Sequence, residues 1–182
     1  MNPPMRAEAG LLYGQLAGQA RLATFYTSLG VPDSIDGRFE MLCIHAHALF
    51  HQLRGQGAAA DQLAQAVYDA MFLDLDGSLR ELGVADLGVG RRIKVMTEAL
   101  KGRIQAYDAA LAATGPEAEE QLRDAIRRNV YGTVDPAPDQ VAAMAGYLRA
   151  LRTALAGAGF ADLAAGRLRF PQPPEESRDA PS

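Results

Sequence analysis

The 182-residue chain has one cysteine, no tryptophan and few serines. A single cysteine excludes a disulfide framework and a zinc site built from a cysteine cluster. No apolar run approaches the roughly 18 residues that a membrane-spanning helix needs. The apolar stretch after Gly10 is interrupted by glycines and glutamines, so we expect no signal peptide and a cytoplasmic location.

Neither sign of charge dominates the composition. The chain carries 18 basic and 22 acidic residues, which give a formal net charge of -4. This balance argues against a protein whose whole surface binds nucleic acid, and we expect no DNA partner. The length fits one domain, which at this size buries ~70 % of the unfolded surface.

Proline is rare in the body of the chain, where only Pro32, Pro116, Pro136 and Pro138 occur between the two ends. Apolar residues recur between these prolines at i, i+3, i+4 and i+7, the spacing of an amphipathic helix. The pattern predicts helices over about 6–28, 36–54, 59–82, 90–111, 117–130 and 136–156. We therefore expect an all-α, single-domain bundle of about six helices over residues 1–165.

Several residues mark the expected helix ends. Asp36 is a candidate N-cap, and Asp135 precedes a first-turn proline. Gly77 predicts a kink or a break in the third helix, and the glycines of 83–90 predict a link between helices. From Gly166 onward proline and charge dominate, so we predict a disordered tail over 166–182.

The three histidines, His45, His47 and His51, lie close together on one predicted helix beside Cys43. His47 and His51 are i, i+4 neighbours, a spacing that can bind a metal ion. A zinc hydrolase would need a glutamate directly after the first histidine, where Ala48 stands. We favour histidines at a half-buried helix margin, and a metal-binding helical protein stays open as an alternative.

The inventory for catalysis is small. No serine lies in a nucleophile-elbow motif, and Cys43 lies on an apolar stripe, where we expect an inert core thiol. The glycines of 83–90 do not have the spacing of a phosphate-binding loop. We therefore predict that the protein is not an enzyme and needs no cofactor.

Charge is segregated along the chain more strongly than the net value shows. Residues 69–86 contain five acids and one base, and residues 91–103 contain five bases and one acid. Arg91, Arg92 and Lys94 stand in the first turns of their helix, where the macrodipole disfavours cations. Either the two blocks pair with each other, or the basic block meets ribosomal RNA or lipid headgroups. A helical adaptor that docks on a ribosome or membrane through this basic face is a second alternative.

An ordered series of short motifs carries a family resemblance. Its main members are Leu29-Gly30-Val31-Pro32-Asp33, Asp36-Gly37-Arg38-Phe39-Glu40, Phe72-Leu73-Asp74-Leu75-Asp76, Leu79-Arg80-Glu81-Leu82-Gly83-Val84 and Gly102-Arg103. In order and spacing the series resembles the ubiquinol–cytochrome c chaperone family, the bacterial relatives of the mitochondrial cytochrome b assembly factors. The resemblance covers about residues 22–111.

The resemblance implies an assembly chaperone, not an enzyme, that binds newly made cytochrome b for maturation of the ubiquinol–cytochrome c reductase, respiratory complex III. The mitochondrial relatives work near the ribosome with a smaller partner, which implies a second small assembly factor and a place at the inner face of the cytoplasmic membrane. Each residue that we expect on the partner-binding face could instead form an internal salt bridge or cap. These residues are Arg38, His45, Asp74, Asp76, Arg80, Asp86, Arg91, Arg92 and Arg103.

Overall fold

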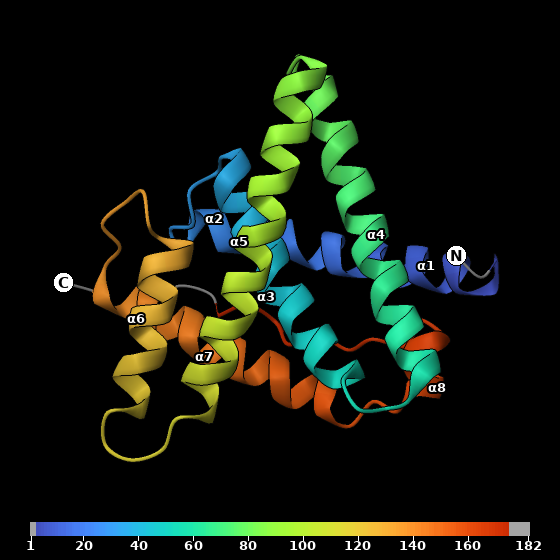
Figure 1. The fold of residues 1–182 in the computed structure, drawn as a ribbon. Coiled ribbons are helices and arrows are strands. Elements are labelled where there is room, and N and C mark those ends of the chain that lie inside the picture. The colour runs from blue at the N-terminus through green and yellow to red at the C-terminus, as the bar shows by residue number, and fades with distance from the viewer. Residues whose placement is uncertain (1–2, 175–182) are drawn as a thin grey trace.

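The computed structural model describes residues 3–174 of the chain and confirms the all-α prediction (Figure 1). Its helices are α1 (Pro3–Ala20), α2 (Ala23–Thr27), α3 (Ile35–Leu53), α4 (Ala58–Glu81), α5 (Asp86–Ala112), α6 (Ala118–Val130), α7 (Pro138–Ala156) and α8 (Phe160–Ala164). Within the described residues, no helix combines the length and apolar character that crossing a bilayer requires.

Helix α3 forms the centre of the bundle. Every residue from 39 to 49 is buried, and α1, α4, α5, α6 and α7 all contact this helix. A helix that is covered on all sides needs apolar or internally hydrogen-bonded residues around its whole circumference. The central position of α3 therefore explains why His45, His47 and Glu40 lie inside the protein.

Helices α4 and α5 form an antiparallel hairpin whose distal part extends beyond the rest of the bundle (Figure 1). We call residues 73–95 the arm. Four of the seven large apolar side chains that are exposed in the described residues belong to it: Leu73, Leu82, Leu87 and Val95. The arm thus presents apolar surface to solvent, whereas the core is concentrated around α3.

The first predicted helix is divided into α1 and α2 in the structure. Leu22 has extended backbone angles, φ -58° and ψ 131°, and ends the run without a glycine or proline. The break places the fully buried Phe25 against His45 and Tyr147, with ring centroids 5.7 and 4.9 Å away. Burial of one large aromatic side chain outweighs the few backbone hydrogen bonds lost at the break.

Three other expected helix boundaries differ from the structure. Ser34, not Asp36, caps α3, because the Ser34 hydroxyl accepts a hydrogen bond from the Gly37 amide at 3.1 Å. Helix α4 continues through Gly77. Helix α5 begins at Asp86, so the link between the two helices is shorter than the predicted link over 83–90. Gly83 alone, with φ +80°, provides the turn.

Helix α7 also begins later than expected, at Pro138 instead of Pro136. Its N-cap residue is Ala137, whose backbone N–H donates to the Gln140 side chain at 3.1 Å. The pyrrolidine nitrogen of Pro138 carries no hydrogen and therefore needs no partner in the first turn.

The beginning of the predicted tail packs against the bundle. The side-chain amide of Gln15 donates to the Gly166 carbonyl at 2.7 Å, and that of Gln19 donates to the Pro171 carbonyl at 3.0 Å. The Phe170 ring lies 6.0 Å from the His45 ring, between centroids. An aromatic residue and two amide contacts thus hold residues 166–174, and residues 175–182 lie outside the described part of the chain.

Candidate binding groove beside the arm

A groove of about 520 Å³ lies where the arm meets the rest of the bundle. Its walls come from the end of α1, the turn before α3, the first half of α3, and the two helices of the arm. Eight of its fifteen lining residues are apolar: Ala20, Ile35, Phe39, Leu42, Leu75, Leu79, Leu82 and Met96. At the groove, Ile35 and Leu82 are 40 % and 62 % exposed, so apolar surface remains open to solvent there.

Four of the five charged residues that line the groove form ion pairs with one another, and the fifth is the exposed Glu81 at its edge. Arg38 donates to Asp33 at 2.8 Å, and Arg21 lies 3.5 Å from Asp74. Tyr13 also donates its hydroxyl proton to Asp74 at 2.6 Å, and burial together with this hydrogen bond raises the pKa of Tyr13. Because these pairs compensate one another, an apolar segment that enters the groove meets neutralised pairs, and Glu81 is exposed and can keep its carboxylate in water.

The predicted site residues Asp76, Arg80 and Asp86 come together on the arm, outside the groove. Arg80 bridges the two carboxylates, with an N···O distance of 2.6 Å to Asp76. Hydrogen bonds to both carboxylates raise the pKa of the Arg80 guanidinium. This triad ties the last turn of α4 to the first turn of α5 at the far end of the arm.

The basic block of α5 pairs with α3 instead of with the neighbouring acidic block. Arg92 donates to Asp36 at 2.7 Å. Arg103 forms a two-pronged ion pair with the buried Glu40, at 2.6 and 3.0 Å. Burial raises the pKa of Glu40, although the bond with Arg103 opposes that rise. Arg91 has no carboxylate within ion-pair distance among the described residues.

His45, which the sequence places on the partner-binding face, lies in the core with no exposed surface. Its Nδ1 lies 2.7 Å from the Met41 carbonyl oxygen and donates a proton to it. Its Nε2 therefore accepts from the Tyr147 hydroxyl at 2.8 Å. Burial lowers the pKa of His45 to about 4, so the ring is neutral at pH 7 and connects α3 to α7.

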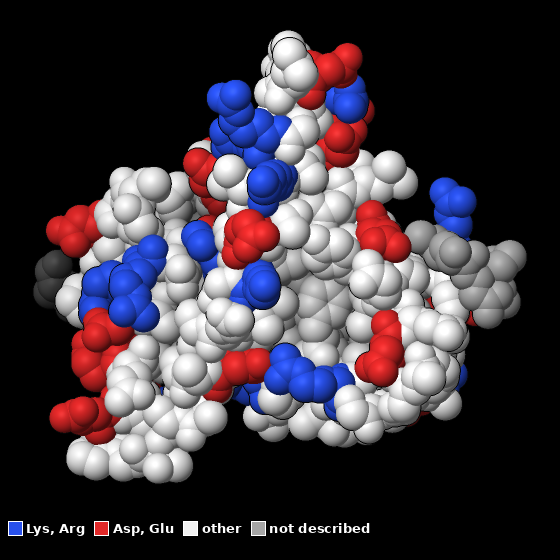
Figure 2. Space-filling view, viewed as in Figure 1, with Lys and Arg blue, Asp and Glu red and all other residues white. Residues whose placement is uncertain are grey.

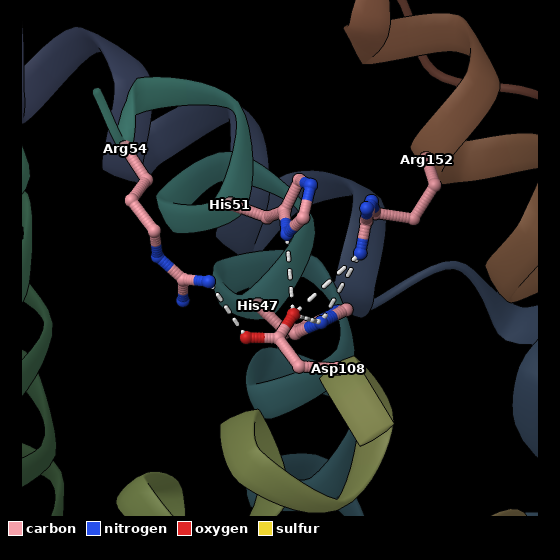
Figure 3. A network of polar contacts seen from close by, with 5 residues as sticks. All are labelled: His47, His51, Arg54, Asp108 and Arg152. Atoms are coloured by element: carbon pink, nitrogen blue, oxygen red, sulfur yellow. Dashed lines mark hydrogen bonds and ion pairs between the residues drawn. The ribbon is translucent and has the colours of Figure 1, made fainter. Parts of the chain in front are cut away.

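The other two histidines belong to a polar network around Asp108 of α5 (Figure 3). The Asp108 carboxylate contacts His47 at 2.9 Å, His51 at 3.2 Å and Arg54 at 2.9 Å. Arg152 of α7 lies 3.7 Å away. Burial alone would raise the pKa of Asp108, but these hydrogen bonds outweigh burial and lower it to about 2. The network joins α3, α5 and α7.

The histidines do not form a metal site in the structure. His45 uses both ring nitrogens for the contacts with Met41 and Tyr147. Over residues 3–174, no group of three or more histidine, cysteine, aspartate or glutamate side chains is arranged to hold a metal ion. The metal-binding alternative is therefore not favoured.

The sequence analysis did not single out the apolar residues of the groove. Leu42, Leu79 and Met96 belong to helical stripes that are also typical of a core, and they are in fact nearly covered. One residue, Leu82, could have indicated the groove from the sequence. It lies next to the Gly83 turn, and a leucine beside a turn is exposed unless another element covers it. Of the predicted residues, Arg38 and Asp74 line the groove.

The described residues thus form an all-helical protein with an open apolar groove and a projecting arm. The sequence profile of the ubiquinol-cytochrome C chaperone family matches residues 27–170, and the chain belongs to this family. Its structure is similar to the crystal structure of the Cbp3 homolog from Brucella abortus, with a TM-score of 0.81 and 33 % sequence identity. The match covers 93 % of this chain and 92 % of that one. No curated protein gives a significant match.

Proposed function

We propose that this protein is an assembly chaperone that holds newly made cytochrome b until it is incorporated into the ubiquinol–cytochrome c reductase. Membership of the chaperone family supports a role in assembling this complex. The observation that carries the proposal further is the open apolar groove beside the arm. Family membership also favours this role over a helical adaptor that binds a ribosome or membrane through a basic face.

The groove has the chemistry for binding an apolar helix. A helix presents side chains at i, i+3, i+4 and i+7 along one face, and such anchors fill apolar grooves in helix-binding proteins. A lipid-facing segment of a membrane protein carries leucine-sized side chains at these positions. Each anchor that leaves water gains about 1.5–3 kcal/mol when fully buried. A few anchors in about 520 Å³ therefore give useful affinity without any catalytic group.

The proposal includes the cellular context of this binding. Cytochrome b is a membrane-embedded client, so the chaperone would meet it in the cytoplasm, at the inner face of the cytoplasmic membrane or beside the ribosome. A second small assembly factor is an additional partner that the family resemblance suggests. A protein that only holds its client needs neither cofactor nor enzymatic activity.

Filling the groove tests the proposal. Ser78 of α4 lines the groove, and Ser78→Trp would place a large ring in the space intended for the client. In a strain that lacks the chromosomal gene, this variant should fail to restore haem b and reductase activity in membranes. Thr153→Trp, at an exposed position of helix α7, is the matched control and should restore both.

Circular dichroism and thermal unfolding of the purified variants would show that both remain folded. The proposal is wrong if the strain without the gene keeps normal membrane haem b. It is also wrong in its location of the site if Ser78→Trp, at normal protein levels, restores function as well as the control does.

A further inference from the structure

The far end of the arm exposes leucines at the point where the molecule projects furthest (Figure 1). Leu82 follows the last residue of α4 and is 62 % exposed, and Leu87 in the first turn of α5 is 93 % exposed. A leucine that is almost fully exposed at the tip of a projection contributes nothing to the fold of the described residues. These two side chains leave apolar area at the tip that is free to contact another surface.

Basic side chains follow the tip leucine on the same side of α5. Leu87, Arg91 and Lys94 are spaced at i, i+4 and i+7, and Figure 2 shows blue side chains gathered on the upper part of this helix. Neither Arg91 nor Lys94 has a carboxylate within ion-pair distance among residues 3–174. The nearby Asp76 and Asp86 are already engaged by Arg80. The tip thus combines an exposed leucine with two available cations.

We propose that the tip of the arm docks on an anionic lipid surface. Leu87 enters the interface between headgroups and acyl chains, and Arg91 and Lys94 contact lipid phosphates. This inference rests on the proposed function in one respect, because a membrane-protein client gives the chaperone a reason to work at a bilayer. A lipid surface explains both features of the tip, whereas RNA would use the cations and leave Leu87 in water.

The contact would be reversible. Each basic residue near an anionic leaflet contributes about 1 kcal/mol, and one leucine side chain adds an apolar term of similar size. The exposed Glu81 and Glu98 limit the attraction, since both lie on the same hairpin. Weak docking suits a protein that must deliver its client and leave, and the groove beside the arm stays available meanwhile.

Vesicle co-sedimentation of the full chain, without any client, tests the proposal. The wild type should bind vesicles of phosphatidylcholine with phosphatidylglycerol and show little binding to phosphatidylcholine alone. Leu87→Ser should lower this binding about fivefold. The double variant Arg91→Gln/Lys94→Gln should lower it about thirtyfold and flatten its salt dependence. Leu11→Ser and Arg128→Gln change an exposed leucine and an exposed arginine of other helices and should leave binding unchanged.

The outcomes separate this proposal from the proposed function. Leu87, Arg91 and Lys94 do not line the groove, so client capture is measured independently with Ser78→Trp. Lipid docking is overturned if the wild type does not prefer anionic vesicles, or if the tip variants bind as the controls do. Loss with the charge variant alone would overturn leucine insertion and leave a purely electrostatic contact with lipid phosphates.

Discussion

At the scale of single residues, His45 and His47 are the polar groups on which the core depends most. Both rings are fully covered, and burial lowers the pKa of each to about 4. The Nδ1 atom of His47 has no hydrogen-bond partner in the described residues, so its protonation would bury an uncompensated N–H group. In the folded protein both histidines therefore stay neutral down to about pH 4. In the unfolded chain they take up a proton near pH 6.5.

This difference in pKa predicts that the folded protein becomes less stable as the pH is lowered. The unfolded chain binds more protons below about pH 6.5, so the free energy of unfolding decreases as the pH falls toward 4. Each histidine should cost about 2 kcal/mol between pH 7 and pH 5. Urea unfolding at these two pH values measures the change. His45→Gln and His47→Gln should each weaken the dependence, and equal stability at both pH values would contradict it.

Asp108 connects more helices than any other side chain of the network in Figure 3. It receives contacts from His47, His51, Arg54 and Arg152, and its own side chain is 24 % exposed. Hydrogen bonds to a charged group contribute about 1.5–3 kcal/mol each when the partner would otherwise remain unpaired. Removal of the negative charge would leave the guanidinium groups of Arg54 and Arg152 near each other without the carboxylate between them.

We predict that Asp108→Asn lowers the free energy of unfolding by about 2–3 kcal/mol at pH 7. Because the pKa of Asp108 is lowered to about 2, this contribution is complete above about pH 5 and is lost as the pH falls from about 4 toward 2. Thermal or urea unfolding measures the loss. Asp61→Asn, an exposed carboxylate of α4, is the matched control and should change stability by less than about 0.5 kcal/mol. Equal effects of the two variants would contradict the role of the network.

At the scale of elements, the first turn of α3 depends on the close approach of Gly37 to Pro32. A Cβ atom on Gly37 would lie 1.9 Å from the Pro32 carbonyl oxygen, which is backbone and cannot move aside easily. This contact sets the angle at which the chain leaves α2 and enters the central helix. The same turn supplies Asp33, Ser34 and Ile35 to the groove.

Two glycine-to-alanine changes should therefore have opposite effects. Gly37→Ala should destabilise the protein by about 2 kcal/mol or more, because the new methyl group clashes with backbone. Gly77→Ala should stabilise it by about 0.5–1 kcal/mol, since Gly77 lies inside α4 with open space around its Cα. Thermal unfolding of both variants measures the difference. A neutral Gly37→Ala would contradict the close packing at this turn.

Sequence periodicity was sufficient for elements whose boundaries are set locally. The bounds of α4 and α6 lie within one residue of the predicted ranges, because apolar stripes and adjacent glycines or prolines define them. The break at Leu22 has no such local signal. It depends on Phe25 fitting between His45 and Tyr147, which lie on helices far along the chain, and this tertiary contact cannot be seen in a helical period.

The candidate site was predictable only in part for the same reason. The segregation of charge drew attention to the arm, where Asp76, Arg80 and Asp86 do come together. The groove itself was not predictable, because its walls come from four helices whose packing the sequence pattern does not specify. His45 looked like a surface residue because the pattern could not show that Tyr147 covers it. The role of the nine predicted residues in binding a partner stays a prediction.

At the scale of the whole molecule, the buried contacts of the core are separated from most of the exposed apolar surface of the described residues. Helix α3 and its neighbours hold the buried residues and the polar network, whereas the arm and groove hold most of the exposed large apolar side chains of the described residues. A rigid body with an open apolar groove can bind an apolar segment with little loss of conformational entropy. This division of the molecule is what a holding function needs.

Site-specific photo-crosslinking during synthesis of cytochrome b tests the central claim most directly. A photoreactive side chain replaces Ser78 in the groove in one strain and Thr153 on the exposed face of α7 in another. The account predicts a covalent adduct between the Ser78 variant and newly made cytochrome b, and no such adduct from Thr153. An equal yield at both positions, or an adduct at Thr153 alone, would contradict the claim that the groove holds the client.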